Sequence, residues 1–168
     1  MADQRGVPDL SQFTAPAQAY YRLHQAALRE RDFDKRVAAS WGLIAHGQES
    51  LPYLMRMLRS RDADSREDAA GALAWLGADA NGIVRELLLA LEQETGQQAR
   101  DSIVLALGTL KNPAAIPALA ELIRSPATDG DTRRCAVESL GKIVRRRFDK
   151  QADPEAAAVT WLDAHTPG

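Results

Sequence analysis

The chain has 168 residues, a formal net charge of −2, 45% hydrophobic residues and only 5% aromatic residues. This length suits one domain, and the aliphatic composition favours packed helices over a β-sandwich. The single cysteine, Cys135, excludes an internal disulfide, and the charge balance opposes general nucleic-acid binding. No apolar run reaches membrane-spanning length and the first residues lack a signal-peptide core, so we expect a cytoplasmic protein without a membrane partner.

The first expected element is a leading helix over residues 16–31, after a polar N-terminal segment over residues 1–15. Alanine, tyrosine and leucine recur in it at helical spacing. We expect this helix to cover the open face of the array that follows. Residues 16–168 are then expected to form one domain.

Four later segments share an arginine that is followed seven residues later by a leucine. The pairs are Arg36/Leu43, Arg66/Leu73, Arg100/Leu107 and Arg133/Leu140, so successive arginines are 30, 34 and 33 residues apart. Small or apolar residues follow each arginine at helical spacing, which indicates one buried stripe of a helix. A period of this length is typical of stacked helical repeats. It predicts repeats over about residues 34–64, 65–97, 98–130 and 131–165.

An acidic residue precedes the arginine by two positions in three of the four units. These acids are Asp34, Asp64 and Asp131. We expect either these acids or the following Ser65 and Thr132 to cap the first helix of each unit. Glu67 stands where a capping-box partner of Asp64 is expected.

A second amphipathic helix is expected in each of the first three repeats, beginning near Leu51, Val84 and Ile116 and running antiparallel to the first. Pro52 and Pro117 fall in the first turn, where proline is tolerated. The fourth unit is less regular. It is expected to end in a helix that begins at residues 153–155 and runs to about residue 164.

These residues resemble the HEAT-like repeat family, particularly the short bacterial repeats of the bilin-lyase type. The third unit carries the resemblance best, through Arg100, the segment 106–108 (Ala-Leu-Gly), the segment 112–113 (Asn-Pro) and the segment 116–119 (Ile-Pro-Ala-Leu). The resemblance covers about residues 34–144. It implies an all-α, right-handed α-solenoid of about four helix-pair repeats with capping terminal helices, related to the armadillo-like folds.

Sequence motifs for catalysis and metal binding are missing from the chain. His24, His46 and His165 lie in different units, without a second ligand at metal-binding spacing. No phosphate-binding loop, dinucleotide fingerprint or serine-hydrolase motif occurs. The sequence therefore favours a protein without catalytic activity, cofactor or metal, and His46 is expected to be a packed side chain.

Two further features allow alternative interpretations. Trp41, Gly71 and Trp75 are predicted to form a shelf on the first helices, which would be a contact site if Trp75 is exposed. Alternatively, Trp41 packs across the gap at Gly71 beneath Tyr20 or Tyr21.

The cluster of Arg145, Arg146 and Arg147 either complements the end of a helix or contacts phosphate or an acidic partner.

The resemblance implies that the second helices line the concave face, where such arrays bind their partners. The predicted partner-binding residues on this face are Tyr53, Arg56, Arg59, Arg85, Glu86, Leu89, Glu121 and Arg124. The first functional hypothesis is a non-catalytic scaffold for a protein partner. The resemblance to HEAT-like lyase subunits gives a second hypothesis, a bilin-binding or lyase-like subunit whose arginines pair the chromophore's propionates. Nucleic-acid binding is the third, against which the acidic balance counts.

Overall fold

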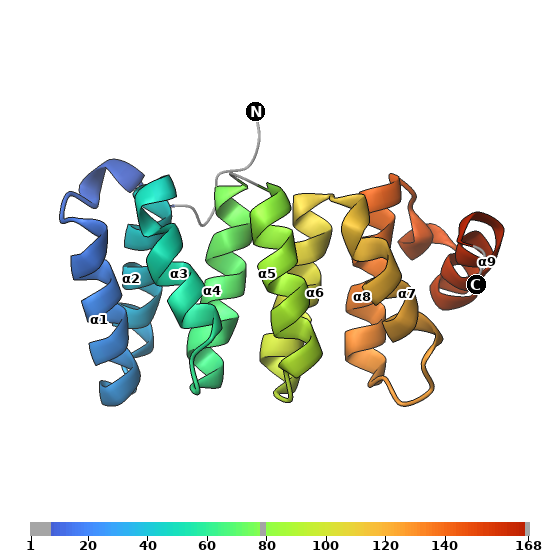
Figure 1. Ribbon diagram of the computed structural model, residues 1–168, viewed down its shortest axis with the longest axis horizontal. Helices are drawn as coiled ribbons and strands as arrows, with labels where there is room; N and C mark the ends of the chain where they lie inside the picture. Colours follow the sequence, from blue (N-terminus) through green and yellow to red (C-terminus); the bar gives the residue numbers. More distant parts are fainter. Residues whose placement is uncertain (1–7, 78–79, 167–168) are drawn as a thin grey trace.

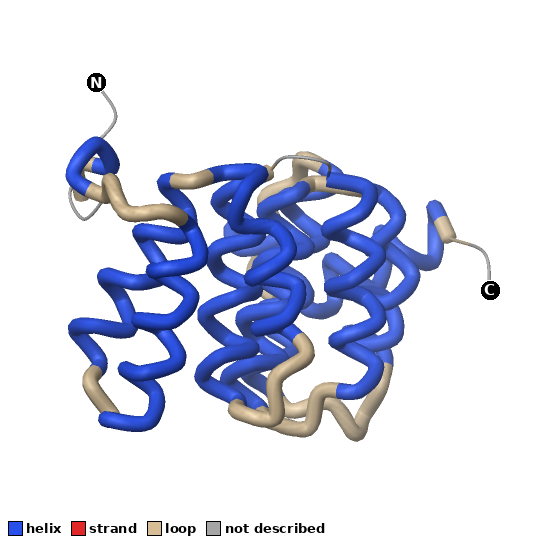
Figure 2. Tube along the Cα trace, turned by 60° about the vertical axis from the view of Figure 1, so that its left-hand side comes forward, coloured by secondary structure: helices blue, strands red, loops and turns tan. Residues whose placement is uncertain are grey.

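The structure of this chain is a computed structural model that describes residues 8–77 and 80–166. Within those residues the regular structure is entirely helical, and Figure 2 shows helices and loops but no strand. The predicted all-α fold class is therefore confirmed. None of the helices in the described part of the chain is both long and apolar enough to cross a bilayer.

The helices from α1 to α8 alternate in direction along the chain, and α9 is turned away from their common axis (Figure 1). They are α1 (Ala17–Glu30), α2 (Phe33–Ala45), α3 (Leu51–Leu58), α4 (Ala63–Leu76), α5 (Ala80–Gln93), α6 (Gln97–Leu110), α7 (Ile116–Arg124), α8 (Gly130–Val144) and α9 (Pro154–His165). Short 3-10 helices lie at η1 (Leu10–Gln12), η2 (Gly47–Ser50), η3 (Pro113–Ala115) and η4 (Phe148–Lys150).

The helices form two layers. The first helices of the repeats, α2, α4, α6 and α8, pack side by side, and the second helices α3, α5 and α7 lie in front of them in Figure 1. The leading helix α1 packs on α2, and α9 packs on α7 and α8 at the other end. The array of helix pairs that the repeat period predicts is thus the observed architecture.

The first helices begin earlier than the sequence interpretation placed them. Asp32, Asp62 and Asp129 are the N-caps of α2, α4 and α8, each accepting a hydrogen bond from a backbone amide of the first turn, and Gly96 caps α6. The expected caps Asp34, Asp64 and Asp131 instead lie in the first turn. The units of α2, α4 and α8 each offer two acids separated by one residue, and use of the earlier one leaves the later acid favourably placed at the positive end of the helix dipole. Ser65 and Thr132 are consequently buried rather than capping, and Asp64 forms no capping box with Glu67.

Three of the repeated arginines hold the loop that precedes their own helix. Their guanidinium groups donate hydrogen bonds to backbone carbonyl oxygens where the chain turns, and these bonds help to satisfy backbone groups outside the helices. The acceptors are Ser60 and Arg61 for Arg66, Glu94 for Arg100, and Ser125 and Thr128 for Arg133. Arg36 follows a much shorter connection and forms ion pairs with Asp64 and Asp68 of α4 instead.

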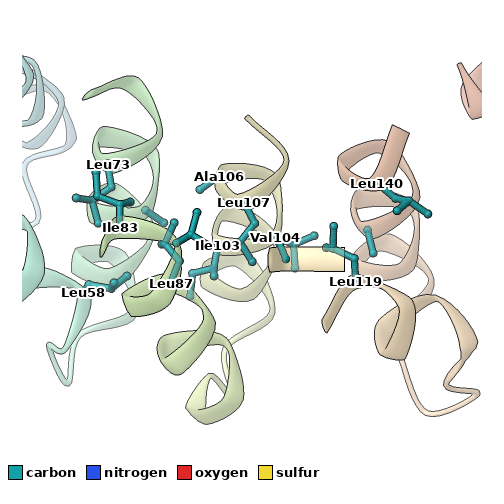
Figure 3. Close-up of a cluster of buried hydrophobic side chains, with 14 of the residues drawn as sticks. Leu58, Leu73, Ile83, Leu87, Ile103, Val104, Ala106, Leu107, Leu119 and Leu140 are labelled. Atoms are coloured by element: carbon teal, nitrogen blue, oxygen red, sulfur yellow. The ribbon is translucent and has the colours of Figure 1, made fainter. Parts of the chain in front are cut away.

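The core runs between the two layers as a continuous apolar stripe. Figure 3 shows its centre, where Leu73, Leu87, Leu107, Leu119 and Leu140 come from five different helices. The leucine that follows each repeated arginine is fully buried in all four units. The seven-residue spacing places each arginine near the start of its helix and each leucine two helical turns further on, in the core.

Small residues bring α6 and α8 into close contact. A Cβ atom added at Gly108 would lie 2.6 Å from the Cα atom of Ser139. The Ser139 hydroxyl is buried there and donates a hydrogen bond of 2.9 Å to the carbonyl oxygen of Val104. A side chain at position 108 would therefore push the two first helices apart.

The leading helix is held by polar and aromatic contacts as well as apolar ones. His24 is fully buried, and its Nε2 atom lies 2.8 Å from the Asp68 carboxylate of α4. Tyr21 stacks on Tyr53 of α3 with ring centroids 5.2 Å apart. These contacts join α1 to both layers, which agrees with its predicted covering role.

Candidate partner-binding surface

The second-helix face is the outer surface of α3, α5 and α7, the layer that faces the viewer in Figure 1. All eight predicted partner-binding residues lie on these three helices or, for Arg59, at the end of α3. Arg56, Arg59, Arg85, Leu89, Glu121 and Arg124 are exposed, whereas Tyr53 and Glu86 are partly buried. The helical register of this face therefore agrees with the sequence, although its role in binding stays a prediction.

Leu89 is the most informative residue of this face. Its side chain is 45% exposed, which is unusual for a leucine beside a well-packed core. It borders a hollow of ≈ 570 Å³ between α3 and α5. It also borders a second hollow of ≈ 360 Å³ between α5 and η3. Leu89 therefore stands between two depressions that could each receive a side chain.

Charged groups around Leu89 differ in how far they are neutralised. Arg59 pairs with Glu86 across α3 and α5, and Arg124 pairs with Asp163 of α9 at 2.7 Å. Arg85, one turn before Leu89, and Glu121 have no ion-pair partner among the described residues. Arginine is among the residue types that most often dominate binding energy in protein interfaces, which makes Arg85 a candidate anchor beside the exposed Leu89.

Tyr53 and Arg56 lie at the α1 end of the same face and contact the leading helix. Tyr53 stacks on Tyr21, and the Arg56 guanidinium lies 5.8 Å from the Tyr21 ring centroid. These two predicted partner-binding side chains thus already contact Tyr21 of α1, which leaves less of their surface for a partner. The side chains of Tyr53 and Arg56 are therefore more constrained than that of Arg85, and neither lines the hollows beside Leu89.

A buried ion pair forms one wall of the larger hollow. Arg66 Nε and Nη2 donate to the two Glu94 carboxylate oxygens at 2.6 and 2.7 Å, and the Glu94 side chain is 1% exposed. The Gly96 amide also donates to Glu94 at 2.8 Å. The hydrogen bonds from Arg66 lower the pKa of Glu94 below its usual value, and those to Glu94 raise the pKa of Arg66. The hollow therefore has a rigid polar wall that stays charged at neutral pH.

Sequence reasoning did not identify this pair or the role of His24. Glu94 follows Arg66 by 28 residues, and Asp64 follows Arg36 by the same interval. The repeated interval of 28 residues is therefore visible in the sequence. The interval alone does not predict an ion pair, because Asp64 lies on a first helix whereas Glu94 follows a second helix.

The tryptophans are arranged as the shelf interpretation expects, with Trp75 exposed, and the alternative packing of Trp41 across Gly71 is not observed. Trp41 and Trp75 meet edge to face with centroids 5.4 Å apart, and Trp75 is 59% exposed. A Cβ atom at Gly71 would meet nothing within 4 Å, so Trp41 does not fill the gap there. Tyr20 stands against Gly42 and Tyr21 against Tyr53, and neither stacks on Trp41. The pair is thus an exposed aromatic contact on the first-helix layer.

The remaining residues that the sequence singled out occupy separate places. His46 is partly buried beside Tyr20, with ring centroids 5.6 Å apart, in agreement with a packed histidine. His165 stacks on Trp161 in α9. The described residues contain no group of three metal-ligating side chains. Arg145, Arg146 and Arg147 are exposed beyond the end of α8, far along the array from α3 (Figure 1).

Comparison with known proteins supports the repeat assignment in the C-terminal half. A search of curated proteins gives no match to this chain. The family model for HEAT repeats matches residues 84–162, which extend from α5 to α9. The preceding helix pairs continue the same two layers and carry the same arginine and leucine positions. Residues 84–162 are accordingly HEAT repeats, within a chain whose described helices pack pairwise as an all-α repeat array.

Proposed function

We propose that this protein is a non-catalytic scaffold that binds a protein partner through its second-helix face. HEAT repeats generally serve as protein-interaction scaffolds, and the repeat family supports that class of function. The observation that carries the choice of face is Leu89, a large exposed apolar side chain between two hollows. Arg85 adds a charge that is not neutralised within the described residues.

The partner that suits this face presents an apolar side chain to each hollow and an acidic group to Arg85. The rigid Arg66–Glu94 wall offers little to a partner, since its hydrogen-bonding groups already have each other. Binding energy should therefore concentrate on Leu89 and Arg85, with Arg56 and Tyr53 at the margin. This ranking differs from one in which all eight residues contribute equally, and mutations can separate the two.

The test compares two variants that remove side chains of similar exposure. Leu89→Ala with Arg85→Ala should weaken capture of the partner by about 2–4 kcal/mol, because a truncated central anchor commonly costs this much. Val37→Ala is the matched control, since Val37 is 38% exposed and lies on α2 in the other layer. Both variants should melt close to the wild-type temperature, as none of the three residues belongs to the core.

The assay is affinity capture from lysate of the source cells, quantified by mass spectrometry for the wild type and both variants. A partner that the wild type and Val37→Ala retain but the double variant loses would support the proposal. A partner lost only from Val37→Ala would move the working surface to the first-helix layer. Visible absorbance after incubation with a bilin, abolished by Arg85→Ala, would instead favour the chromophore-binding alternative.

A further inference from the structure

A cationic hollow lies at the opposite end of the array from α1, between the C-terminal ends of α6 and α8. The two helices run in the same direction, so both C-terminal ends reach the same edge of the array (Figure 1). The hollow has a volume of ≈ 760 Å³, within the range of small-molecule sites. Its lining includes Lys111 at the end of α6 and Arg145 and Arg146 beyond the end of α8.

Three positive charges of this hollow have no counterion. Arg134, Lys142 and Arg147 also line it, but they pair with Asp131, Glu138 and Asp149 at 2.7, 2.7 and 2.9 Å. Lys111, Arg145 and Arg146 form no side-chain hydrogen bond or ion pair within the described residues. The backbone amides of Lys111, Arg145 and Arg146 donate to carbonyl oxygens in the last turns of α6 and α8, but their side chains do not, so capping of the helix ends does not account for the three side-chain charges.

The segment that carries the arginines is fixed to α8. The Arg146 amide donates to the carbonyl oxygen of Gly141 at 2.9 Å, and a Cβ atom at Gly141 would lie 2.7 Å from the Arg146 carbonyl oxygen. Phe148 follows and is only 5% exposed. The cations therefore project from a backbone that is anchored on both sides of them, rather than from a loose tail.

The floor of the hollow is apolar, because Phe148 and Val137 line it beside Gly141 and Pro154. This combination of an apolar floor and a cationic rim selects a ligand that has both kinds of surface. A phosphate group carries about two negative charges near neutral pH and accepts several hydrogen bonds, so it matches three free cations better than one carboxylate does. We propose that this hollow binds an organic phosphate whose apolar part rests on Phe148 and Val137.

A nucleic-acid strand suits the hollow less well. Single strands bind where several exposed aromatic side chains stack on successive bases, whereas the described lining of the hollow has one aromatic side chain, Phe148, which is only 5% exposed and offers part of its edge as floor. The unpaired charges also converge on one hollow of limited size instead of following a groove along the repeats. The site lies away from the second-helix face, so the test of phosphate binding is independent of the test of the scaffold proposal.

The backbone offers variants that remove charge without harming the fold. Lys111 and Arg145 have left-handed backbone conformations, with φ of 52° and 57°. Glycine adopts this conformation most readily, so Lys111→Gly with Arg145→Gly should keep or raise the melting temperature. Arg31→Gly is the matched control: Arg31 ends α1 with φ of 56°, but it lies at the other end of the array and outside the hollow.

Isothermal titration of the full chain with ADP, inorganic pyrophosphate and adenosine tests the charge and the apolar contribution separately. ADP should bind more tightly than pyrophosphate, and adenosine should bind weakest. The double glycine variant should bind ADP and pyrophosphate at least about tenfold more weakly, since each lost contact to a charged group is substantial. Arg31→Gly should match the wild type.

Three results would overturn the proposal. The first is the absence of binding by both ADP and pyrophosphate at millimolar concentration. The second is equal binding by the double glycine variant and the wild type. The third is an oligonucleotide single strand that binds through the same cations more tightly than ADP does, with steep salt dependence, because a nucleic-acid site would then replace the organic-phosphate site.

Discussion

Replacement of Gly108 by alanine should destabilise the array, although alanine is the better helix former. The added Cβ atom would lie 2.5 Å from the Ser139 Oγ atom and 2.6 Å from its Cα atom. Ordinary carbon contacts are about 3.5–4.0 Å, so α6 and α8 would have to separate by about 1 Å. The nearest atoms include backbone, and a rotamer change at Ser139 alone cannot relieve the contact.

The magnitude follows from three contributions. Overpacking of a tight interface costs about 1–3 kcal/mol. Separation of the helices also stretches the buried hydrogen bond from Ser139 to Val104, worth about 1 kcal/mol. The gain from alanine over glycine inside a helix is about 1 kcal/mol and opposes both. The expected net loss is about 1–3 kcal/mol, or roughly 2–4 °C in Tm per kcal/mol for a chain of this size.

Gly71→Ala is the control, because Gly71 is also inside a first helix but a Cβ atom there meets nothing within 4 Å. This variant should gain about 0.5–1 kcal/mol from helix propensity alone. Urea denaturation followed by circular dichroism measures both free energies of unfolding. If Gly108→Ala is as stable as Gly71→Ala, the close approach of α6 and α8 is not what that glycine provides, and the reasoning is refuted.

Further predictions concern the core and the buried ion pair. Leu107→Asp should abolish cooperative unfolding, since a fully buried leucine would become an unpaired carboxylate that costs several kcal/mol. Gln93→Asp is the control, because Gln93 is exposed and its replacement should leave Tm almost unchanged. Equal Tm shifts in the two variants would mean that the helical register is misassigned. The pKa of Glu94 is lowered in the folded state, so its contribution is complete above the ordinary pKa of 4.5 and is lost as pH falls below that value. Glu94→Gln should therefore cost about 3 kcal/mol at pH 7, because it leaves Arg66 without its counterion, and should flatten the acid side of the stability curve measured by urea titration. An unchanged acid limb in this variant would contradict that role for Glu94.

The sequence by itself determined the fold class and the register of the helices. The arginine and leucine recur at one period, and each leucine is buried as the stripe predicts. Such a pattern is readable because every unit must bury the same face of its helix against its neighbours, which repeats the same local constraint along the chain. The outward residues of α3, α5 and α7 followed from the same register.

The tertiary structure decided everything that depends on contacts between units. Two acids, separated by one residue, are both suitable N-caps for α2, α4 and α8, and only the structure shows that the earlier one is the cap. The Arg66–Glu94 pair, the burial of His24 and the exposure of Leu89 each require the position of a neighbouring helix to within an ångström or two. The free cations around Phe148 likewise come from helix ends that are more than thirty residues apart, as Lys111 and Arg145 are, and local sequence cannot show which charges meet or which already have a partner.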